Sequence, residues 1–490
     1  MPAPVPVGQQ RSAPRAAAWQ TLFDAVAALS RRYERLCAAY GGPLLLLALA
    51  AFAASRVFVW SLMVPGDVPY YARYAYEARV AHQQGATIYE HFYPPDTWPK
   101  TVEYPPLAVD LLALVGRLVP PAVDPDDFTR SFSTAFHTLI FGLDLVTLAA
   151  VVAYRLRRRT PLSAVVAGVV TYTLAGLVLK NFLYSRLDVL LGQLLALALV
   201  LMIAPGRRTL VSSAVLSVAV AFKLVPVLLI PIWLVGALHA TPASLAALTR
   251  ELARKGAAMA AVVLLPWVVF GLRLGEDAIS FLRIHAARGI HIESSWGTVT
   301  VLLSKVGLPV SVELFRSYDV ESSLSSSFAA LAPAVLAGGC ALIYGLYFRQ
   351  ARRMAPAPGI DGGSVAQRDP ELFKLAMLAT VVFSLAASTV LSPQYLLWLL
   401  PLGLLMPWGL SHGRSWGLVS HPVLLILAFL TALIVPKFYT SDVLRLTWFG
   451  TTLLTLRNAG IVLYAALLIA YLARYRRMSP AEPPLRPLES

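Results

Sequence analysis

The amino-acid sequence predicts an all-α polytopic membrane protein, a bundle of about twelve transmembrane helices with roughly 20 apolar residues in each. Hydrophobic residues make up 58% of the 490-residue chain and charged residues only 14%, which leaves too little polar surface for a soluble globule. The apolar residues form long runs, and arginine and lysine gather in short segments between them. The net charge of +15 therefore indicates membrane orientation and not nucleic-acid binding.

The first apolar run, 43–64, is too long for the core of a signal peptide, and no small-residue cleavage site follows it. We interpret it as an uncleaved first helix that begins a membrane domain over 43–474, between a cytoplasmic segment 1–42 and a cytoplasmic tail 475–490. The other runs that could cross a hydrocarbon core of about 30 Å lie near 131–154, 161–179, 187–204, 209–236, 256–272, 328–348, 371–391, 394–410, 417–436 and 454–474.

Basic clusters predict which loops face the cytoplasm, because cytoplasmic loops carry an excess of arginine and lysine. Both termini should lie on that side. The clusters are "RRYER" at 31–35, "RLRRR" at 155–159, "GRR" at 206–208, "RQARR" at 349–353 and "RYRR" at 474–477.

The segment "YPPLAVDLLALVGRLVPP", 104–121, is apolar, but if it crossed the membrane "RLRRR" would fall outside. Between its proline pairs it offers about 14 residues, or roughly 21 Å of helix, which is too short to span. We therefore expect an amphipathic helix at the outer interface, within one large extracytoplasmic loop over 65–130. A second interfacial helix is expected at 70–84, where the rings of its tyrosines would be buried and their hydroxyls hydrated.

A similar argument applies to 209–236, where Lys223 and Pro226 interrupt the apolar run. A single long helix would place the following "TRELARK" outside, whereas two short passes that turn near Lys223 keep it inside. We expect the two short passes.

With the sides assigned, polar residues gather on the outer face, several of them at or inside helix ends. An ionised group at mid-membrane depth costs roughly 2.5 to 3.5 kcal/mol, so these residues need partners or a function. Arginine and lysine can bind a lipid-linked phosphate, and a carboxylate can take a proton from a sugar hydroxyl. We assign Asp67 as the general base and Lys223, Arg288 and Arg186 as phosphate ligands. The remaining candidates for substrate binding are Glu103, Tyr104, Asp188, Gln193, His291, Glu293, Gln394 and Tyr395.

Each candidate also has a structural interpretation. Asp67 can cap the following helix, and Lys223 can be a snorkelling lysine. Arg186 and Asp188 can be a snorkelling charge and a helix cap, and "SPQY" at 392–395 can be a turn. His291 and Glu293 lack the spacing of a metal-binding HExxH motif, and Cys37 and Cys340 lie far apart, so no metal, disulfide or cofactor is expected.

The order of several short motifs resembles the integral-membrane C-type glycosyltransferases, specifically glycosyltransferase family 87. These motifs are the aspartate after the first helix, "VEYPPL", "GQ" in "DVLLGQLLALAL", "KLVP" at 223–226 and "SPQYLLWLLPL". The resemblance implies a bacterial plasma-membrane enzyme whose site faces outward. It implies inverting, metal-independent transfer of a sugar, mannose in the polyprenol-phosphate-mannose-dependent members, from a polyprenyl monophosphate to a glycolipid or cell-envelope glycan. Asp67 would match the family's base and Lys223 its signature lysine.

The alternative function is transport or flipping of lipid-linked sugars, since about twelve helices with both ends inside also fit a transporter of two halves. Transporters of that kind place polar residues at the midplane between repeated halves. Here the polar residues lie near the outer mouth and no repeat is visible, which favours the enzyme.

Overall fold

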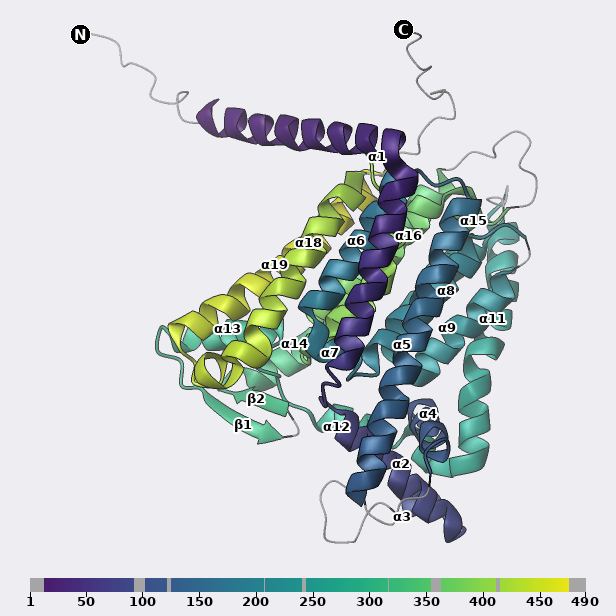
Figure 1. Cartoon of the computed structure of the whole chain (residues 1–490), viewed down its shortest axis with the longest axis vertical. Coiled ribbons are helices and arrows are strands. Elements are labelled where there is room, and N and C mark those ends of the chain that lie inside the picture. Colours follow the sequence, from purple (N-terminus) through teal and green to yellow (C-terminus); the bar gives the residue numbers. More distant parts are fainter. Residues whose placement is uncertain are drawn as a thin grey trace.

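The computed structural model describes residues 13–91, 102–120, 125–206, 208–239, 244–315, 317–353, 363–410 and 415–475. Within these ranges the chain is a bundle of helices with a group of short elements at one end (Figure 1). Of the expected cytoplasmic tails, 1–12 and 476–490 lie outside the described residues.

Among the described residues, seven helical segments are long and apolar enough to cross a membrane, which confirms a multi-pass, predominantly helical membrane protein. The number of crossings stays a prediction, because four further apolar helices have only 10–17 residues. The long segments contain α1 (Ala13–Ser61), α5 (Pro125–Arg157), α11 (Leu245–Leu274) with η2 (Gly275–Ile279) and α12 (Phe281–Ala287), α14 (Ser325–Arg352), α16 (Pro370–Ala387), α18 (Ser415–Ala432) with η4 (Leu433–Val443), and α19 (Trp448–Ala473). The shorter ones are α6 (Leu162–Val178), α8 (Asp188–Ile203), α9 (Thr209–Phe222), and η1 (Val225–Leu229) with α10 (Ile230–Ala237).

The interruption expected near Lys223 is present. Helix α9 ends at Phe222, and Lys223 has extended backbone angles (φ −155°, ψ 126°). Pro226 cannot donate a backbone hydrogen bond and restricts the residue before it, which favours a break at this point. A second break follows α16, where the chain continues as the 3₁₀ helix η3 (Pro393–Trp398) and the short α17 (Leu400–Gly403).

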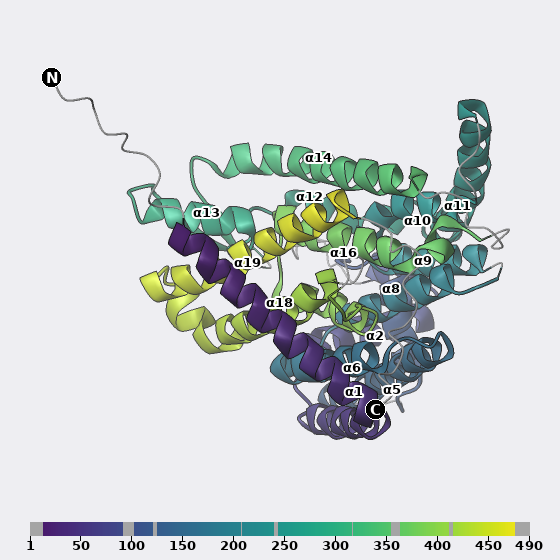
Figure 2. The ribbon, with the colours of Figure 1, turned by 90° about the horizontal axis from the view of Figure 1, so that it is seen from above.

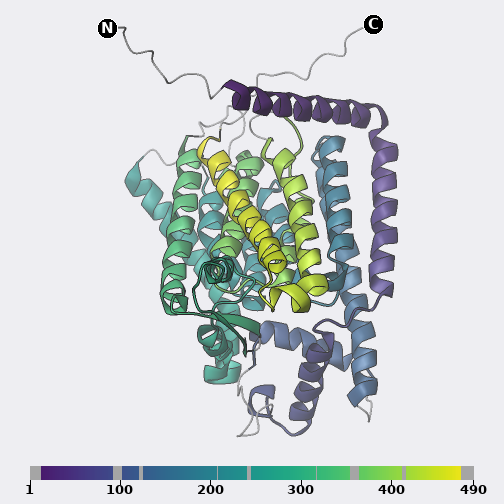
Figure 3. The same ribbon diagram turned by 90° about the vertical axis from the view of Figure 1, so that its left-hand side faces the viewer.

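The described parts of the basic clusters lie at one end of the bundle, which is the upper end in Figures 1 and 3. The first part of α1 crosses this end, seen from above in Figure 2, and the helix turns sharply at Tyr40 (φ −128°, ψ 22°). Tyr33 in the first cluster donates a hydrogen bond of 2.8 Å to the carbonyl of Ser163, at the start of α6. Arg349, in the fourth cluster, donates one of 3.0 Å to the carbonyl of Ala473, beside the fifth. Helix α15 (Val365–Arg368) lies at the same end.

The opposite end carries the short elements α2 (Val68–Gln83), α3 (Ile88–His91), α4 (Pro106–Arg117), α7 (Lys180–Leu183) and α13 (Ser295–Ser304). Helix α4 has 12 residues, about 18 Å, too short to cross a hydrocarbon core, and it packs on α2. An antiparallel hairpin of β1 (Ser311–Phe315) and β2 (Ser317–Glu321) also lies here, which the sequence analysis did not predict.

The tyrosines of α2 correct one expectation. Tyr71 and Tyr74 are each 1% exposed, so they do not present hydrated hydroxyls at an interface. Both rings pack edge-on against Tyr104, and Tyr71 also contacts Phe136 of α5. The aromatic rings are therefore the core that holds α2 and the segment before α4 onto the bundle, because large buried rings dominate packing energy.

A fully buried ion pair joins three helices in the interior. Arg56 of α1 binds Asp144 of α5 at 2.8 Å, and neither side chain is exposed. Arg56 also donates 3.0 Å to the carbonyl of Tyr172 in α6, while the hydroxyls of Tyr172 and Tyr184 donate to Asp144. We call these four residues the buried clamp. Asp144 thus has polar partners inside the bundle.

Candidate functional site

A cavity of about 1090 Å³ opens at the end of the bundle opposite the basic clusters. All the predicted site residues except Gln193 line it, although they come from widely separated segments. Gln193 lies farther along α8, where it is 6% exposed and its amide nitrogen has no hydrogen-bond partner. The lining members of the predicted set are Asp67, Glu103, Tyr104, Arg186, Asp188, Lys223, Arg288, His291, Glu293, Gln394 and Tyr395.

Asp67 occupies the N-cap position of α2, yet its side chain makes no capping hydrogen bond. Gly66 precedes it with φ +47°, and an added Cβ there would lie 2.4 Å from the hydroxyl oxygen of Ser185. The backbone of Asp67 donates to the Ser185 carbonyl at 3.4 Å. The glycine turn thus brings α2 against the segment after α7, and the Asp67 carboxylate forms an ion pair with Arg186. Capping does not explain this aspartate.

Arg186 lies in the turn between α7 and α8, which is held by a hydrogen bond of 2.8 Å from Ser185 to the carbonyl of Asn181. Burial lowers the pKa of Arg186 to about 10, against the opposing effect of the Asp188 and Glu293 carboxylates. The guanidinium therefore stays charged at neutral pH. Its Nε atom is buried and has no hydrogen-bond partner.

Lys223 and Asp188 form a second ion pair, 2.5 Å between Nζ and Oδ1. The indole of Trp398 donates to the same oxygen at 2.7 Å. The ammonium also lies 4.4 Å from the ring centroid of Tyr395 and 5.0 Å from that of Trp398, and these two rings stack on each other. The two helix breaks, before η1 and before η3, thus meet at one cation–π site.

Glu103 and Arg288 form a third ion pair on the cavity wall. The backbone N–H of Glu103 donates 3.2 Å to the hydroxyl of Tyr74. Tyr104 follows directly and packs against the rings of Tyr71 and Tyr74. The extended segment before α4 is therefore fixed to α2 and reaches across to the residue after α12.

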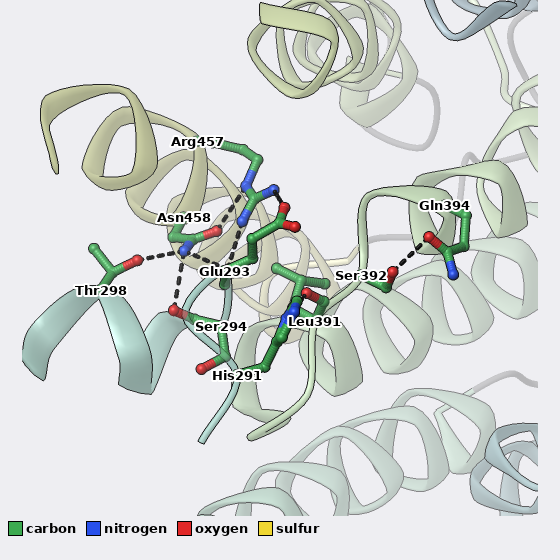
Figure 4. Close-up of polar contacts among 9 residues, drawn as sticks. All are labelled: His291, Glu293, Ser294, Thr298, Leu391, Ser392, Gln394, Arg457 and Asn458. Carbon is green, nitrogen blue, oxygen red and sulfur yellow. Dashed lines mark hydrogen bonds and ion pairs between the residues drawn. The ribbon is translucent and has the colours of Figure 1, made fainter. Parts of the chain in front are cut away.

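His291 and Glu293 lie between α12 and α13 and are both buried (Figure 4). His291 donates from Nδ1 to the carbonyl of Leu391 at 2.6 Å, because a carbonyl can only accept. Burial lowers the pKa of His291 despite the nearby Glu293 carboxylate. The imidazole is accordingly neutral at pH 7, and its Nε2 is a hydrogen-bond acceptor on a residue that lines the cavity.

Arg457 and Asn458 of α19 hold Glu293 in place (Figure 4). Arg457 binds the Glu293 carboxylate at 2.7 Å, and Asn458 donates 2.8 Å to its backbone carbonyl. Asn458 also donates to the carbonyl of Ser294 at 3.1 Å and to the hydroxyl of Thr298. Glu293 is therefore committed to this network, and its carboxylate is less available for substrate chemistry than that of Asp67.

Gln394 begins η3 beside Ser392, whose hydroxyl donates to its amide oxygen at 2.5 Å (Figure 4). The cavity is also lined by aliphatic side chains from the segment 224–228, α14 and α16, which we call the apolar wall: Leu224, Val225, Leu228, Leu336 and Leu385. The lining of the cavity is thus both polar and aliphatic.

Cations and carboxylates are paired on the wall of the cavity. Each of the three predicted phosphate ligands is paired with a carboxylate of the same wall. An unpaired charge in the wall of a cavity inside the protein is costly because it has lost part of its hydration. Cations and carboxylates are therefore found in pairs. Among the described residues, no three His, Cys, Asp or Glu side chains are grouped so that they could hold a metal ion.

Several residues of the site are not in the set of site residues predicted from the sequence. Trp398, Tyr70, Arg73, Tyr318 and Tyr439 line the cavity, and Arg457 supports it from behind. A signal existed only for Arg457, since an arginine inside an apolar run requires a partner. The aromatic residues gave no comparable signal because similar residues occur throughout the chain.

Comparison of the chain with protein-family models, with curated proteins and with solved structures gives no match.

Proposed function

We propose that the protein is a membrane glycosyltransferase that transfers a sugar from a prenyl monophosphate to the hydroxyl group of a glycolipid or glycan. The observation that carries this proposal is the Asp67 carboxylate. It stands at a helix end without capping that helix, beside a partly buried arginine, on the wall of a cavity large enough for a donor and an acceptor. Mannose as the sugar rests on the family resemblance alone.

Different lining residues of the cavity suit different parts of such a donor. The apolar wall suits a prenyl chain, which gains by leaving water. The arginine and lysine side chains of the lining suit the phosphate, and Tyr395 with Trp398 offers an aromatic surface for a sugar ring. A neutral His291 can accept a hydrogen bond from a sugar hydroxyl.

In the proposed reaction the Asp67 carboxylate accepts the proton of the acceptor hydroxyl. The hydroxyl oxygen forms a bond to the anomeric carbon on the face opposite the phosphate. The bond between that carbon and the phosphate oxygen breaks, and its electron pair stays on the phosphate. The configuration at the anomeric carbon inverts.

The basic clusters favour a bacterial plasma-membrane orientation in which both termini are cytoplasmic and the cavity faces outward. Helix α5 has 33 residues, about 50 Å, so its two ends can lie on opposite sides of the membrane. In intact cells an impermeant thiol reagent should label cysteine in place of Asp126 but not in place of Arg158. Labelling of both positions would contradict this orientation.

Transport of lipid-linked sugars is the second candidate, because the breaks before η1 and η3 resemble the discontinuous helices at transporter binding sites. One assay separates the two functions. Purified protein in detergent would receive a radiolabelled prenyl-phosphate mannose and an extract of native membranes as the acceptor source. Release of prenyl phosphate together with a labelled product supports the transferase, since detergent micelles allow no gradient. Flipping of the intact donor in vesicles, without release, would support transport.

A further inference from the structure

Arg186 differs from the other two predicted phosphate ligands in how its carboxylate partner is held. The side chain of Asp67 is 30% exposed, compared with 17% for Glu103 and 6% for Asp188. Asp188 is also fixed by the indole of Trp398. For Asp67, the ion pair with Arg186 is the only side-chain interaction among the described residues. This pair is therefore the easiest of the three to exchange for another anion.

The guanidinium of Arg186 has unused capacity for a second anion. It carries five N–H donors in a planar fork. Nη1 faces Asp67, while the buried Nε has no hydrogen-bond partner. The side chain of Arg186 lines the cavity, so an anion that enters meets this guanidinium and its ion pair with Asp67.

Building on the proposed function, we propose that Arg186 is the shared counter-ion of the catalytic base and the departing phosphate. The donor phosphate competes with Asp67 for Arg186. When the phosphate engages the guanidinium, Asp67 loses part of its cation and becomes a stronger base. The base is thus activated when the donor is bound.

The charges of the reaction balance across this residue. Before transfer, Asp67 carries one negative charge, Arg186 one positive charge and the phosphodiester donor one negative charge. The proton of the acceptor neutralises Asp67, and the electron pair of the broken carbon–oxygen bond adds one negative charge to the phosphate. One negative charge therefore disappears on one side of Arg186 while one appears on the other, and the total is unchanged.

A binding experiment without turnover tests the competition. The probe is farnesyl phosphate, a short prenyl monophosphate, and farnesol, which lacks the phosphate, is its matched control. Asp67→Asn removes the competing charge and keeps the shape, so it should tighten farnesyl phosphate binding by about three- to thirtyfold, which lies within the range for coupled neighbours. Farnesol binding should not change. Arg186→Gln should weaken farnesyl phosphate binding, and the double variant should behave as Arg186→Gln alone.

Three results would overturn the inference. Asp67→Asn could leave farnesyl phosphate binding unchanged or weaken it. Its tightening could persist with Arg186→Gln, which would indicate a general charge effect. Glu103→Gln, the matched carboxylate variant, could reproduce the whole pattern. If Arg186→Gln does not fold, Arg186→Lys replaces it, because lysine keeps the charge but lacks the Nε edge, and the tightening should then shrink.

The two proposals fail in different ways. If the wild-type protein does not prefer farnesyl phosphate to farnesol and transfers no sugar, the proposed function fails together with this inference. If the wild-type protein transfers sugar and prefers farnesyl phosphate, but Asp67→Asn does not tighten binding, only the counter-ion inference fails.

Discussion

Replacing Asp67 by asparagine separates a catalytic role from a structural one, because the two roles predict opposite effects on turnover and stability. Asparagine has nearly the same shape as aspartate but cannot accept the proton. Turnover per folded molecule should therefore fall by about 10²- to 10⁴-fold, the contribution typical of general acid–base catalysis. Asp67→Glu should recover part of this loss if the longer side chain still reaches the acceptor.

The stability of Asp67→Asn follows from its contacts. Since Asp67 makes no capping hydrogen bond, the cost of about 0.5 to 2 kcal/mol for a lost cap does not arise. Its ion pair with Arg186 joins side chains that are 30% and 18% exposed, and pairs of this kind are worth about 0 to 1 kcal/mol. The free energy of unfolding should therefore change by less than about 1 kcal/mol.

The assay compares the release of prenyl phosphate from labelled donor with the thermal unfolding of the same preparation. Asp110→Asn is the matched control, since Asp110 also forms a partly exposed ion pair, with Arg273, but does not line the cavity. That variant should keep full turnover. Transfer by folded Asp67→Asn protein at more than about a tenth of the wild-type rate would refute the base assignment, and Glu103 would be the next carboxylate to test.

Two further predictions concern buried charges. Lys223→Met leaves the Asp188 carboxylate without its cation, so it should lower the free energy of unfolding by about 3 kcal/mol or more and raise the Michaelis constant for the donor. Adding Asp188→Asn should restore the melting temperature but not the affinity for the donor. A normal Michaelis constant in the double variant would exclude phosphate binding by Lys223. Gly176→Ala places a Cβ 2.3 Å from Nη1 of Arg56 and should lower the melting temperature. Gly142→Ala is the control, because a Cβ there meets open space. Equal melting temperatures of the two variants would show that Arg56 can move aside without loss of stability.

Most helix positions and the break near Lys223 could be predicted from the sequence because they depend on local composition. The expected helix over 394–410 was wrong, since the chain there forms η3 and the short α17. Apolar runs give the long helices, and a lysine followed by Pro226 gives the interruption after α9. The grouping of distant residues at one cavity was also predictable, since it needs only the sidedness of the loops and the positions of helix ends. The sequence does not specify how deep each helix sits, and so the short helices leave the number of crossings open.

The pairing of charges could not be predicted, because it depends on how distant segments pack. Glu103 and Arg288 are 185 residues apart, and Glu293 and Arg457 are 164 apart. Local pattern does not determine which carboxylate approaches which cation. The cost of an ionised group in an apolar run predicts that Arg457 has a partner but does not identify it. The role of Arg186 therefore became visible only in the structure.

The buried clamp connects the interior of the bundle to the site chemistry. Arg56 lies on α1, which ends shortly before Asp67, while Tyr184 lies two residues before Arg186. Both are bound to the same carboxylate, Asp144, so the two segments that carry Asp67 and Arg186, the proposed base and its proposed counter-ion, are anchored to one point inside the bundle. A catalytic pair must be held to within about 0.5 Å by its supporting residues. A fully buried ion pair is costly to form, and we infer that its value here is to fix this distance and not to add stability.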